Sequence, residues 1–228
     1  MSCKVMMFSK KNNLFCDYAE LILKSFFKDE FISIRGDSGE PFDLSLSIHK
    51  PKFVISFVSP WIIPERILQS AKTAAINFHP GSPDYPGTGC YNFALYEQAK
   101  TYGITCHHMN AKVDTGQIIM TSYFSISEFE SVESLKLKSM THLLYCFERI
   151  INMIANDEEL PVSSENWRRK PFTRKQMLEL FYIPSDCTDE SEIQLKLKAS
   201  SYPSYKGAYT IVEGRKFYFE AEDRKPIV

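Results

Sequence analysis

Short apolar runs alternate with amphipathic stretches along the first 126 residues of this chain, and polar loops separate them. The strand-like runs span residues 3–8, 53–57, 74–79, 103–109 and 117–126, and the helix-like stretches span residues 17–27, 64–71 and 90–100. Asp17 is the expected cap of the first helix. Strands that alternate with helices form a mainly parallel sheet with helices on both faces. The sequence therefore predicts an α/β, Rossmann-like fold, with its functional groups at the carboxyl ends of the strands.

The second half of the chain predicts a long helix and a small appendage. Residues 134–154 have apolar side chains at helical spacing, and two polar connections follow at residues 156–166 and 184–192. A short helix at 192–199 then leads into two strand-like runs, 208–212 and 216–221, joined through Glu213 and Gly214. Glycine favours a tight hairpin turn because it adopts positive φ readily. We expect a main domain over residues 1–183 and a C-terminal helix and β-hairpin over residues 184–228.

Composition and charge narrow the class of function. The 228 residues include 27 Lys and Arg against 28 Asp and Glu, so no long-range positive field favours nucleic acid. The six cysteines have no spacing typical of a zinc site, and no run approaches the roughly 18 apolar residues of a membrane span. We therefore expect a cytoplasmic protein with reduced cysteines and without metal, nucleic acid or membrane partners. The aromatic side chains of the hairpin favour burial against the core or a second copy, and a homodimer is expected.

The segment INFHPGS, residues 76–82, places two polar side chains at the end of an apolar strand. Alternate residues of a strand share a face, so Asn77 and His79 point to one side while Ile76 and Phe78 point to the other. One interpretation is structural, with both polar groups holding the following loop through its backbone. The other is that they form half of an active site, and the surrounding pattern favours it.

That pattern resembles a known family. The segment INFHPGSPDYPGTGCYNFALYEQAKTYGITCHHMNAKVDTGQI, together with SPWIIPERIL upstream, resembles the core of the 10-formyltetrahydrofolate-dependent formyltransferases over residues 50–126. In that family N-x-H-P precedes a proline- and glycine-rich loop, a helix, a G-[IV]-T-x-H-x-M strand and a D-x-G-x-I turn. The short chain and the small hairpin are most similar to sugar N-formyltransferases. Pro86 stands where the transfer-RNA branch usually has arginine, which argues against a transfer-RNA acceptor.

The resemblance implies three catalytic residues, Asn77, His79 and Asp114. Asn77, as an amide donor, would bind the oxyanion that develops on the formyl carbon. His79 would do the same or carry a proton, because imidazole titrates near neutral pH. Asp114 would orient His79 or accept the proton, and the sequence leaves these roles open.

The resemblance also suggests where the two substrates bind. Trp61, Ile62, Ile63 and Val113 correspond to the wall of the folate slot, although core packing is the alternative for each side chain. Tyr85, Tyr91 and Lys10 are the candidates for binding the acceptor. Lys10 would meet a pyrophosphate, and the equal alternative is that it is a solvated loop lysine. Trp167 lies in the basic segment 165–176 and either stacks on a base or anchors a solvated connector, which we favour. His107 and His108 are adjacent on a strand, so at most one of them reaches a cleft.

The expected function is transfer of a formyl group from 10-formyltetrahydrofolate to a nucleotide-linked amino-dideoxysugar, with dTDP-4-amino-4,6-dideoxyglucose as the expected acceptor. The alternatives within enzymes are a formyltransferase for another amine and a formyltetrahydrofolate hydrolase. The alternative from another class is a non-catalytic module that binds folate or a nucleotide sugar.

Overall fold

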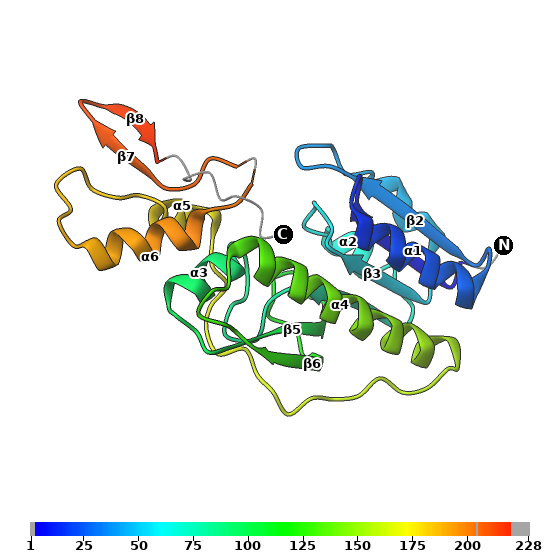
Figure 1. Cartoon of the computed structure of the whole chain (residues 1–228). Helices are drawn as coiled ribbons and strands as arrows, with labels where there is room; N and C mark the ends of the chain where they lie inside the picture. Colours follow the sequence, from blue (N-terminus) through cyan, green and yellow to red (C-terminus); the bar gives the residue numbers. More distant parts are fainter. Residues whose placement is uncertain (1–2, 204, 220–228) are drawn as a thin grey trace. The chain divides into compact units, whose positions relative to one another are not determined.

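The structure is a computed structural model that describes residues 3–203 and 205–219 (Figure 1). The elements follow the order β1 (Val5–Lys10), α1 (Leu14–Phe27), β2 (Phe31–Gly36), the 3-10 helix η1 (Leu44–His49), β3 (Phe53–Phe57), α2 (Glu65–Leu68), β4 (Ala74–His79), α3 (Cys90–Tyr96), β5 (Thr101–His108), β6 (Ile118–Ser125), α4 (Val132–Ala155), α5 (Arg174–Leu180), α6 (Glu190–Ser200), β7 (Tyr209–Val212) and β8 (Arg215–Tyr218). Ser204 and residues 220–228, which the predicted appendage includes, lie outside the described residues.

Among the described residues, six strands form one sheet in the order β2-β1-β3-β4-β5-β6. The pairs β1/β2, β1/β3 and β3/β4 are parallel, and β4/β5 is antiparallel. The parallel strands therefore bring Lys10, Gly36, Phe57 and His79 to the same edge of the sheet. This arrangement confirms the predicted α/β fold with a mostly parallel sheet.

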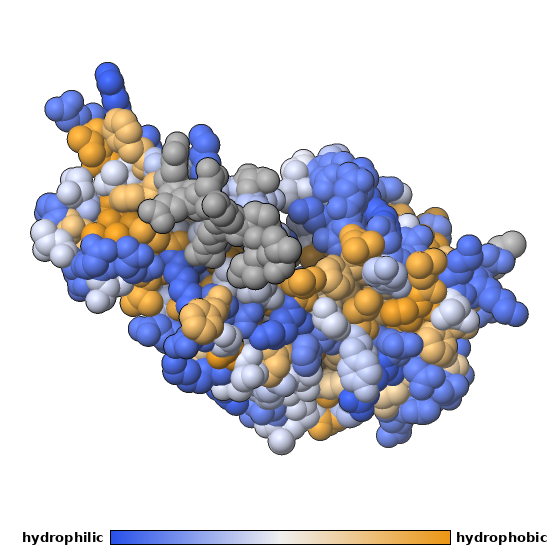
Figure 2. Space-filling model, in the orientation of Figure 1, coloured by the Kyte–Doolittle hydropathy of each residue, from blue (hydrophilic) through white to orange (hydrophobic). Residues whose placement is uncertain are grey.

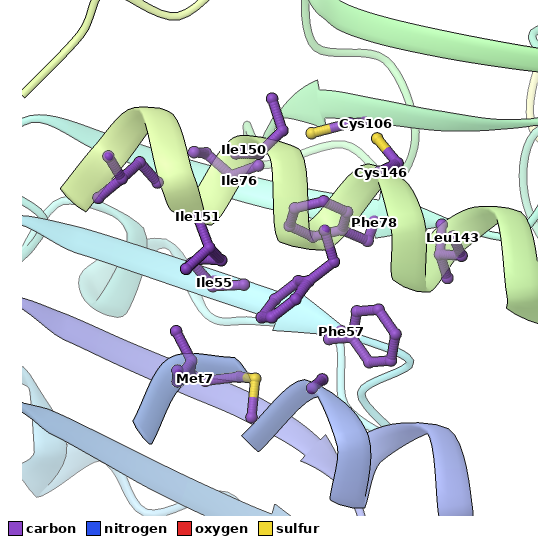
Figure 3. Close-up of a cluster of buried hydrophobic side chains, with 14 of the residues drawn as sticks. Met7, Ile55, Phe57, Ile76, Phe78, Cys106, Leu143, Cys146, Ile150 and Ile151 are labelled. Atoms are coloured by element: carbon purple, nitrogen blue, oxygen red, sulfur yellow. The ribbon is translucent and has the colours of Figure 1, made fainter. Parts of the chain in front are cut away.

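One face of the sheet is covered by α1 and by the part of α4 that follows Met140. Figure 3 shows Leu143, Cys146, Ile150 and Ile151 of α4 next to the strand residues Ile55, Phe57, Ile76, Phe78 and Cys106. Phe57, Phe78 and Phe147 pack with ring centroids 5.0–6.0 Å apart. The apolar residues Ile76 and Phe78 thus fix β4 against the helices, and the intervening Asn77 and the terminal His79 are left on the opposite face.

The opposite face of the sheet carries a smaller apolar cluster. Met6, Phe8 and Val54 pack there against Ile63 and Ile67, and Leu46 of η1 lies beside them. Helical layers on both faces were predicted from the alternating pattern, and the two clusters confirm them.

Near the amino terminus one local prediction was wrong and one strand was missed. Asn13, and not Asp17, caps α1, because the Asn13 side chain accepts a hydrogen bond from the Cys16 backbone N–H at 3.1 Å. Asp17 lies in the first turn and forms an ion pair with Arg35. The strand β2 was not predicted, because its residues are mostly half-buried and lack a continuous apolar run.

The chain divides into two compact units. Counting only the described residues, the first unit lies within residues 1–86, 103–123 and 139–171. The second unit lies within residues 87–102, 124–138 and 172–228. In the second unit, Phe93 of α3 stacks on Phe172 with a centroid separation of 3.7 Å, and Tyr96 donates a hydrogen bond to Glu192 of α6. Helix α5 was not predicted; it begins inside the basic segment expected to be a connector, at a capping box formed by Thr173 and Gln176.

The predicted C-terminal helix and hairpin are both present. Asp189 caps α6, and β7 pairs with β8 in antiparallel fashion through Glu213 and Gly214, whose φ angles are 48° and 73°. Positive φ at both central residues is typical of the tight turn that matches strand twist. The proposed domain boundary after residue 183 stays a prediction.

Apolar side chains are exposed on several parts of the described surface. Figure 2 shows such residues over α1, where Leu14, Tyr18 and Leu21 are exposed, and on the hairpin, where Ile211 and Phe217 are exposed. All six cysteines are free, and burial raises the pKa of the Cys106 thiol well above its ordinary value. None of the helices in the described ranges is long and apolar enough to cross a membrane.

Candidate active site

The side chains at the end of β4 meet a carboxylate from the turn that follows β5. Asp114 Oδ2 lies 3.2 Å from Nδ1 of His79, and Asp114 Oδ1 accepts a hydrogen bond from Nδ2 of Asn77 at 3.3 Å. Only 5% of His79 and 5% of Asp114 are exposed, whereas Asn77 is half-buried. The structure thus brings together the three residues that the resemblance singled out, and Asn77 is the one that solvent reaches.

A second histidine completes this cluster. Nε2 of His107 lies 3.2 Å from Asp114 Oδ1 and 3.1 Å from Asn77 Nδ2, and its Nδ1 lies 2.8 Å from the backbone oxygen of His108. The His108 carbonyl can accept a hydrogen bond only if Nδ1 of His107 carries a proton. In a neutral imidazole Nε2 is then unprotonated and can accept a hydrogen bond from the Asn77 amide. The Asn77 amide can then use its two hydrogens on His107 and Asp114, so a substrate oxygen that takes one of them must displace one of these contacts.

His79 is held between two acceptors. Its Nδ1 faces the Asp114 carboxylate, and its Nε2 lies 2.9 Å from the backbone oxygen of Tyr85. Both contacts are hydrogen bonds only when both ring nitrogens carry a proton. The imidazole thus has an acceptor beside each ring nitrogen, which suits a residue that passes a proton along or donates to a negative charge.

The loop after β4 fits closely around His79. A Cβ atom added at Gly81 would lie 2.4 Å from His79 Nε2, and the Gly81 carbonyl accepts a hydrogen bond from the Thr105 hydroxyl at 2.7 Å. Asp114 adopts a φ of 43°, which is rarely populated by residues other than glycine, asparagine and aspartate. Strained or crowded backbone of this kind is typical of functional sites.

Trp167 lies against both imidazole rings. Its ring centroid is 5.0 Å from that of His107 and 5.9 Å from that of His79, each in an edge-to-face arrangement. Its indole N–H donates to the Gly116 backbone oxygen at 2.8 Å. The neighbouring Arg168 forms an ion pair with Asp84, and the Asp84 carboxylate raises the Arg168 pKa.

His107 and Trp167 were not among the predicted site residues. The sequence allowed one of His107 and His108 to reach a cleft, and the β4/β5 register selects His107 by pairing it with Asn77. His108 is the other member, and burial together with nearby His107 lowers its pKa. The anchoring interpretation of Trp167 agrees with its hydrogen bond, but its contacts with two histidines have no signal in the local sequence.

The four residues expected to line the folate slot fall into two pairs. The Trp61 indole packs against Phe8 and Phe42 and donates to the Glu40 backbone oxygen at 2.9 Å, while Ile63 is buried in the same cluster. Ile62 and Val113, by contrast, are 75% and 42% exposed. The exposed pair is therefore available to a ligand, and the packed pair supports the backbone between β3 and α2.

The three residues expected to bind the acceptor also lie in different settings. Lys10 ends β1 and is half-buried. Tyr85 is buried with the Arg169 guanidinium 5.2 Å from its ring centroid, and its backbone oxygen is the group that faces His79. Tyr91 belongs to α3 in the second unit, where its ring packs against Tyr102.

Comparison with known proteins identifies the same family that the sequence motifs resemble. The family model described as "Formyl transferase" matches residues 17–143, which is more than half of the chain. The GDP-perosamine N-formyltransferase of Brucella melitensis is 23% identical over 195 residues, which cover 85% of this chain and 73% of that protein. The bifunctional polymyxin resistance protein ArnA of Wigglesworthia glossinidia brevipalpis is 33% identical over 115 residues, half of this chain but only 17% of the relative.

Solved structures share the fold. A sugar N-formyltransferase from a Shewanella species superimposes with a TM-score of 0.76 at 17% identity, covering 96% of this chain and 97% of the other. An N-formyltransferase from Helicobacter canadensis, solved with folinic acid and dTDP-3-aminofucose, superimposes with a TM-score of 0.71 at 20% identity and covers 92% and 84%.

Proposed function

Because the chain belongs to the formyl transferase family, we propose that it transfers a formyl group from 10-formyltetrahydrofolate to the amino group of a nucleotide-linked amino-dideoxysugar. The observation that carries the proposal is the contact of Asn77, His79 and Asp114 at the end of β4. The names of the Brucella and Helicobacter relatives support a sugar amine as the acceptor and a folate as the donor.

The chemistry of formyl transfer suits these side chains. The lone pair of the sugar amine attacks the formyl carbon, a C–N bond forms, and the carbonyl oxygen becomes an oxyanion. In the proposed reaction the Asn77 amide and an N–H of His79 stabilise that charge; one such donor is typically worth about 3 kcal/mol. The attacking amine, which has become positively charged, loses a proton to the Asp114 carboxylate, directly or through water. The carbonyl double bond then re-forms, the bond to the folate nitrogen breaks, and that nitrogen takes a proton from His79, which regains one from Asp114.

Burial makes the cluster effective. Asp114 and His79 are almost completely shielded from solvent, and electrostatic interactions are stronger where water is excluded. Much of the remaining acceleration would come from holding the two substrates in register. In the proposed model Ile62 and Val113 contact the folate, with Trp61 and Ile63 fixing that wall, and Lys10, Tyr85 and Tyr91 contribute to acceptor binding.

The acceptor can be identified by direct assay. The purified protein is incubated with 10-formyltetrahydrofolate and, separately, with dTDP-4-amino-4,6-dideoxyglucose, dTDP-3-aminofucose and GDP-perosamine, and the products are analysed by mass spectrometry. We expect one of these acceptors to gain a formyl group, and we propose that it is dTDP-4-amino-4,6-dideoxyglucose. We expect His79→Asn to abolish the reaction. Ser25→Ala on the exposed face of α1 serves as the control.

Other outcomes would identify the alternatives. Formate released without any acceptor would identify a formyltetrahydrofolate hydrolase, and formylation of an amine outside the panel would replace the sugar. Binding of both ligands without turnover would identify a non-catalytic module. A cytoplasmic location and a homodimeric state remain parts of the proposal; fractionation tests the first, and a monomer in sedimentation at micromolar concentration would contradict the second.

A further inference from the structure

The segment formed by residues 163–169 is hydrogen-bonded to two of the loops that border the catalytic cluster. The Ser163 backbone N–H donates to the Ile118 oxygen at 3.1 Å, and the Trp167 indole N–H donates to the Gly116 oxygen at 2.8 Å. On the other side, the Arg168 backbone N–H donates to the Pro83 oxygen at 3.0 Å. The 163–169 segment thus connects the turn that carries Asp114 with the loop that follows His79.

Trp167 is the residue of this segment that contacts the cluster itself. Its ring meets the His107 ring at 87° and the His79 ring at 66°, so a single indole borders both imidazoles. Each imidazole also has a nitrogen facing Asp114, at 3.2 Å in both cases. Rotation of either ring away from the carboxylate would therefore require the indole to move, and the indole is fixed by its hydrogen bond to Gly116.

We propose that Trp167 is a positioning residue, which holds His79 and His107 in the orientation that faces Asp114 and keeps the Asp114 turn beside the His79 loop. This inference rests on the proposed formyl transfer for its kinetic consequence. It assigns Trp167 no contact with the reacting atoms. It differs from the alternative in which Trp167 stacks on a nucleotide base, because a stacking residue would act on substrate binding and a positioning residue acts on turnover.

Kinetics separate these two roles. We expect Trp167→Leu to lower kcat on the order of 10²-fold, the effect of a small misplacement of catalytic groups, with KM for both substrates little changed. Trp167→Phe retains an aromatic edge without the N–H and should restore a large part of kcat. Tyr145→Leu, which removes an exposed aromatic ring on α4, is the matched control. A raised KM for the nucleotide sugar at unchanged kcat would overturn the proposal in favour of stacking.

A second measurement does not depend on catalysis. The chain has two tryptophans, Trp61 and Trp167, so Trp61→Phe leaves Trp167 as the single fluorescent reporter. Indole emission depends on the groups in contact with the ring, and the His107 and His79 rings both border Trp167. Emission of the Trp61→Phe protein should therefore change when His79→Asn or His107→Asn is added.

The control for this measurement is His49→Asn, a histidine at the end of η1, which should leave the emission unchanged. Emission that is unaffected by the loss of both site histidines would overturn the assigned geometry. A change in emission in a protein that fails to transfer a formyl group would instead preserve the positioning of the rings and reject the proposed function.

Discussion

Asn77 and His107 lie opposite each other in the antiparallel β4/β5 pair, with Asn77 Nδ2 3.1 Å from His107 Nε2. Residues paired directly across two antiparallel strands have their side chains on the same face of the sheet. The pairing therefore places His107 beside the polar residues of β4, and Asp114 reaches the same point from the turn that follows β5. The cluster is thus a product of strand register as much as of the motif around His79.

This register predicts unequal roles for two adjacent histidines. His107→Phe removes the acceptor for one hydrogen of the half-buried Asn77 amide, a contact typically worth about 0.5–1.5 kcal/mol. If the loss falls on the transition state, kcat/KM should drop roughly 2- to 13-fold. The measurement is steady-state kinetics of formyl transfer.

His108→Phe is the matched control, because His108 lies on the other face of the same strand. It should leave kcat/KM nearly unchanged. Equal losses in the two variants would show that the β4/β5 register does not define the site.

The parts of the fold that could be predicted are those whose local sequence decides their structure. The strands β3 and β4 agree with the predicted residues because each is a short apolar run next to a proline or a polar loop. The strand β2 was missed because its residues are half-buried and its hydrogen-bonding partner, β1, is known only from the fold. Helix α5 was missed because its capping box lies within a segment dominated by basic charge.

The residues of the candidate site also divide into those that the local sequence predicts and those that depend on the fold. Asn77, His79 and Asp114 could be proposed because the segments that carry them, INFHPGS and VDTGQI, resemble motifs of a known family. His107 required the strand register, and Trp167 required the path of the 163–169 segment, and neither is encoded in a local period of the sequence. The contrast between exposed Ile62 and buried Ile63 likewise depends on the conformation of the chain between β3 and α2.

Asn77→Ala tests the proposed oxyanion role. Removing a comparable donor typically costs about 10²- to 10³-fold in kcat, and KM should change little because the interaction forms mainly in the transition state. Single-turnover kinetics with excess enzyme measures the chemical step directly. A variant with unchanged single-turnover rate would restrict Asn77 to a structural role beside His107 and Asp114.

Gly116→Ala tests how closely the Asp114 turn approaches β5. The added Cβ would lie 1.7 Å from the His108 backbone oxygen, which cannot move without disturbing the strand. We expect a loss of about 3 kcal/mol or more in the free energy of unfolding, at or above the usual cost of overpacking. Urea denaturation followed by circular dichroism measures it.

The comparison variant is Gly39→Ala, where no atom lies within 4 Å of the added Cβ but φ is +92°. Backbone strain alone costs about 1–3 kcal/mol, so this variant should be the milder of the two. A Gly116→Ala protein as stable as Gly39→Ala would contradict the close approach.

Glu130 gives the second unit a pH-dependent contribution to stability. Burial alone raises the Glu130 pKa, but hydrogen bonds from Lys138, Ser134 and the Ser127 backbone, together with the Lys138 charge, lower it below the ordinary value of 4.5. A group whose pKa is lower in the folded than in the unfolded state binds fewer protons when folded, so unfolding takes up protons and stability rises with pH. The contribution is complete above the unfolded pKa and is lost as the pH falls through the folded pKa.

Urea unfolding between pH 7 and pH 3 measures this contribution. The acid-induced loss of unfolding free energy should therefore be smaller in Glu130→Gln than in the native chain, whereas Glu148→Gln on the exposed face of α4 should follow the native curve. Parallel curves for Glu130→Gln and the native chain would mean that the Lys138–Glu130 contact, 2.6 Å long in the structure, contributes nothing to folding.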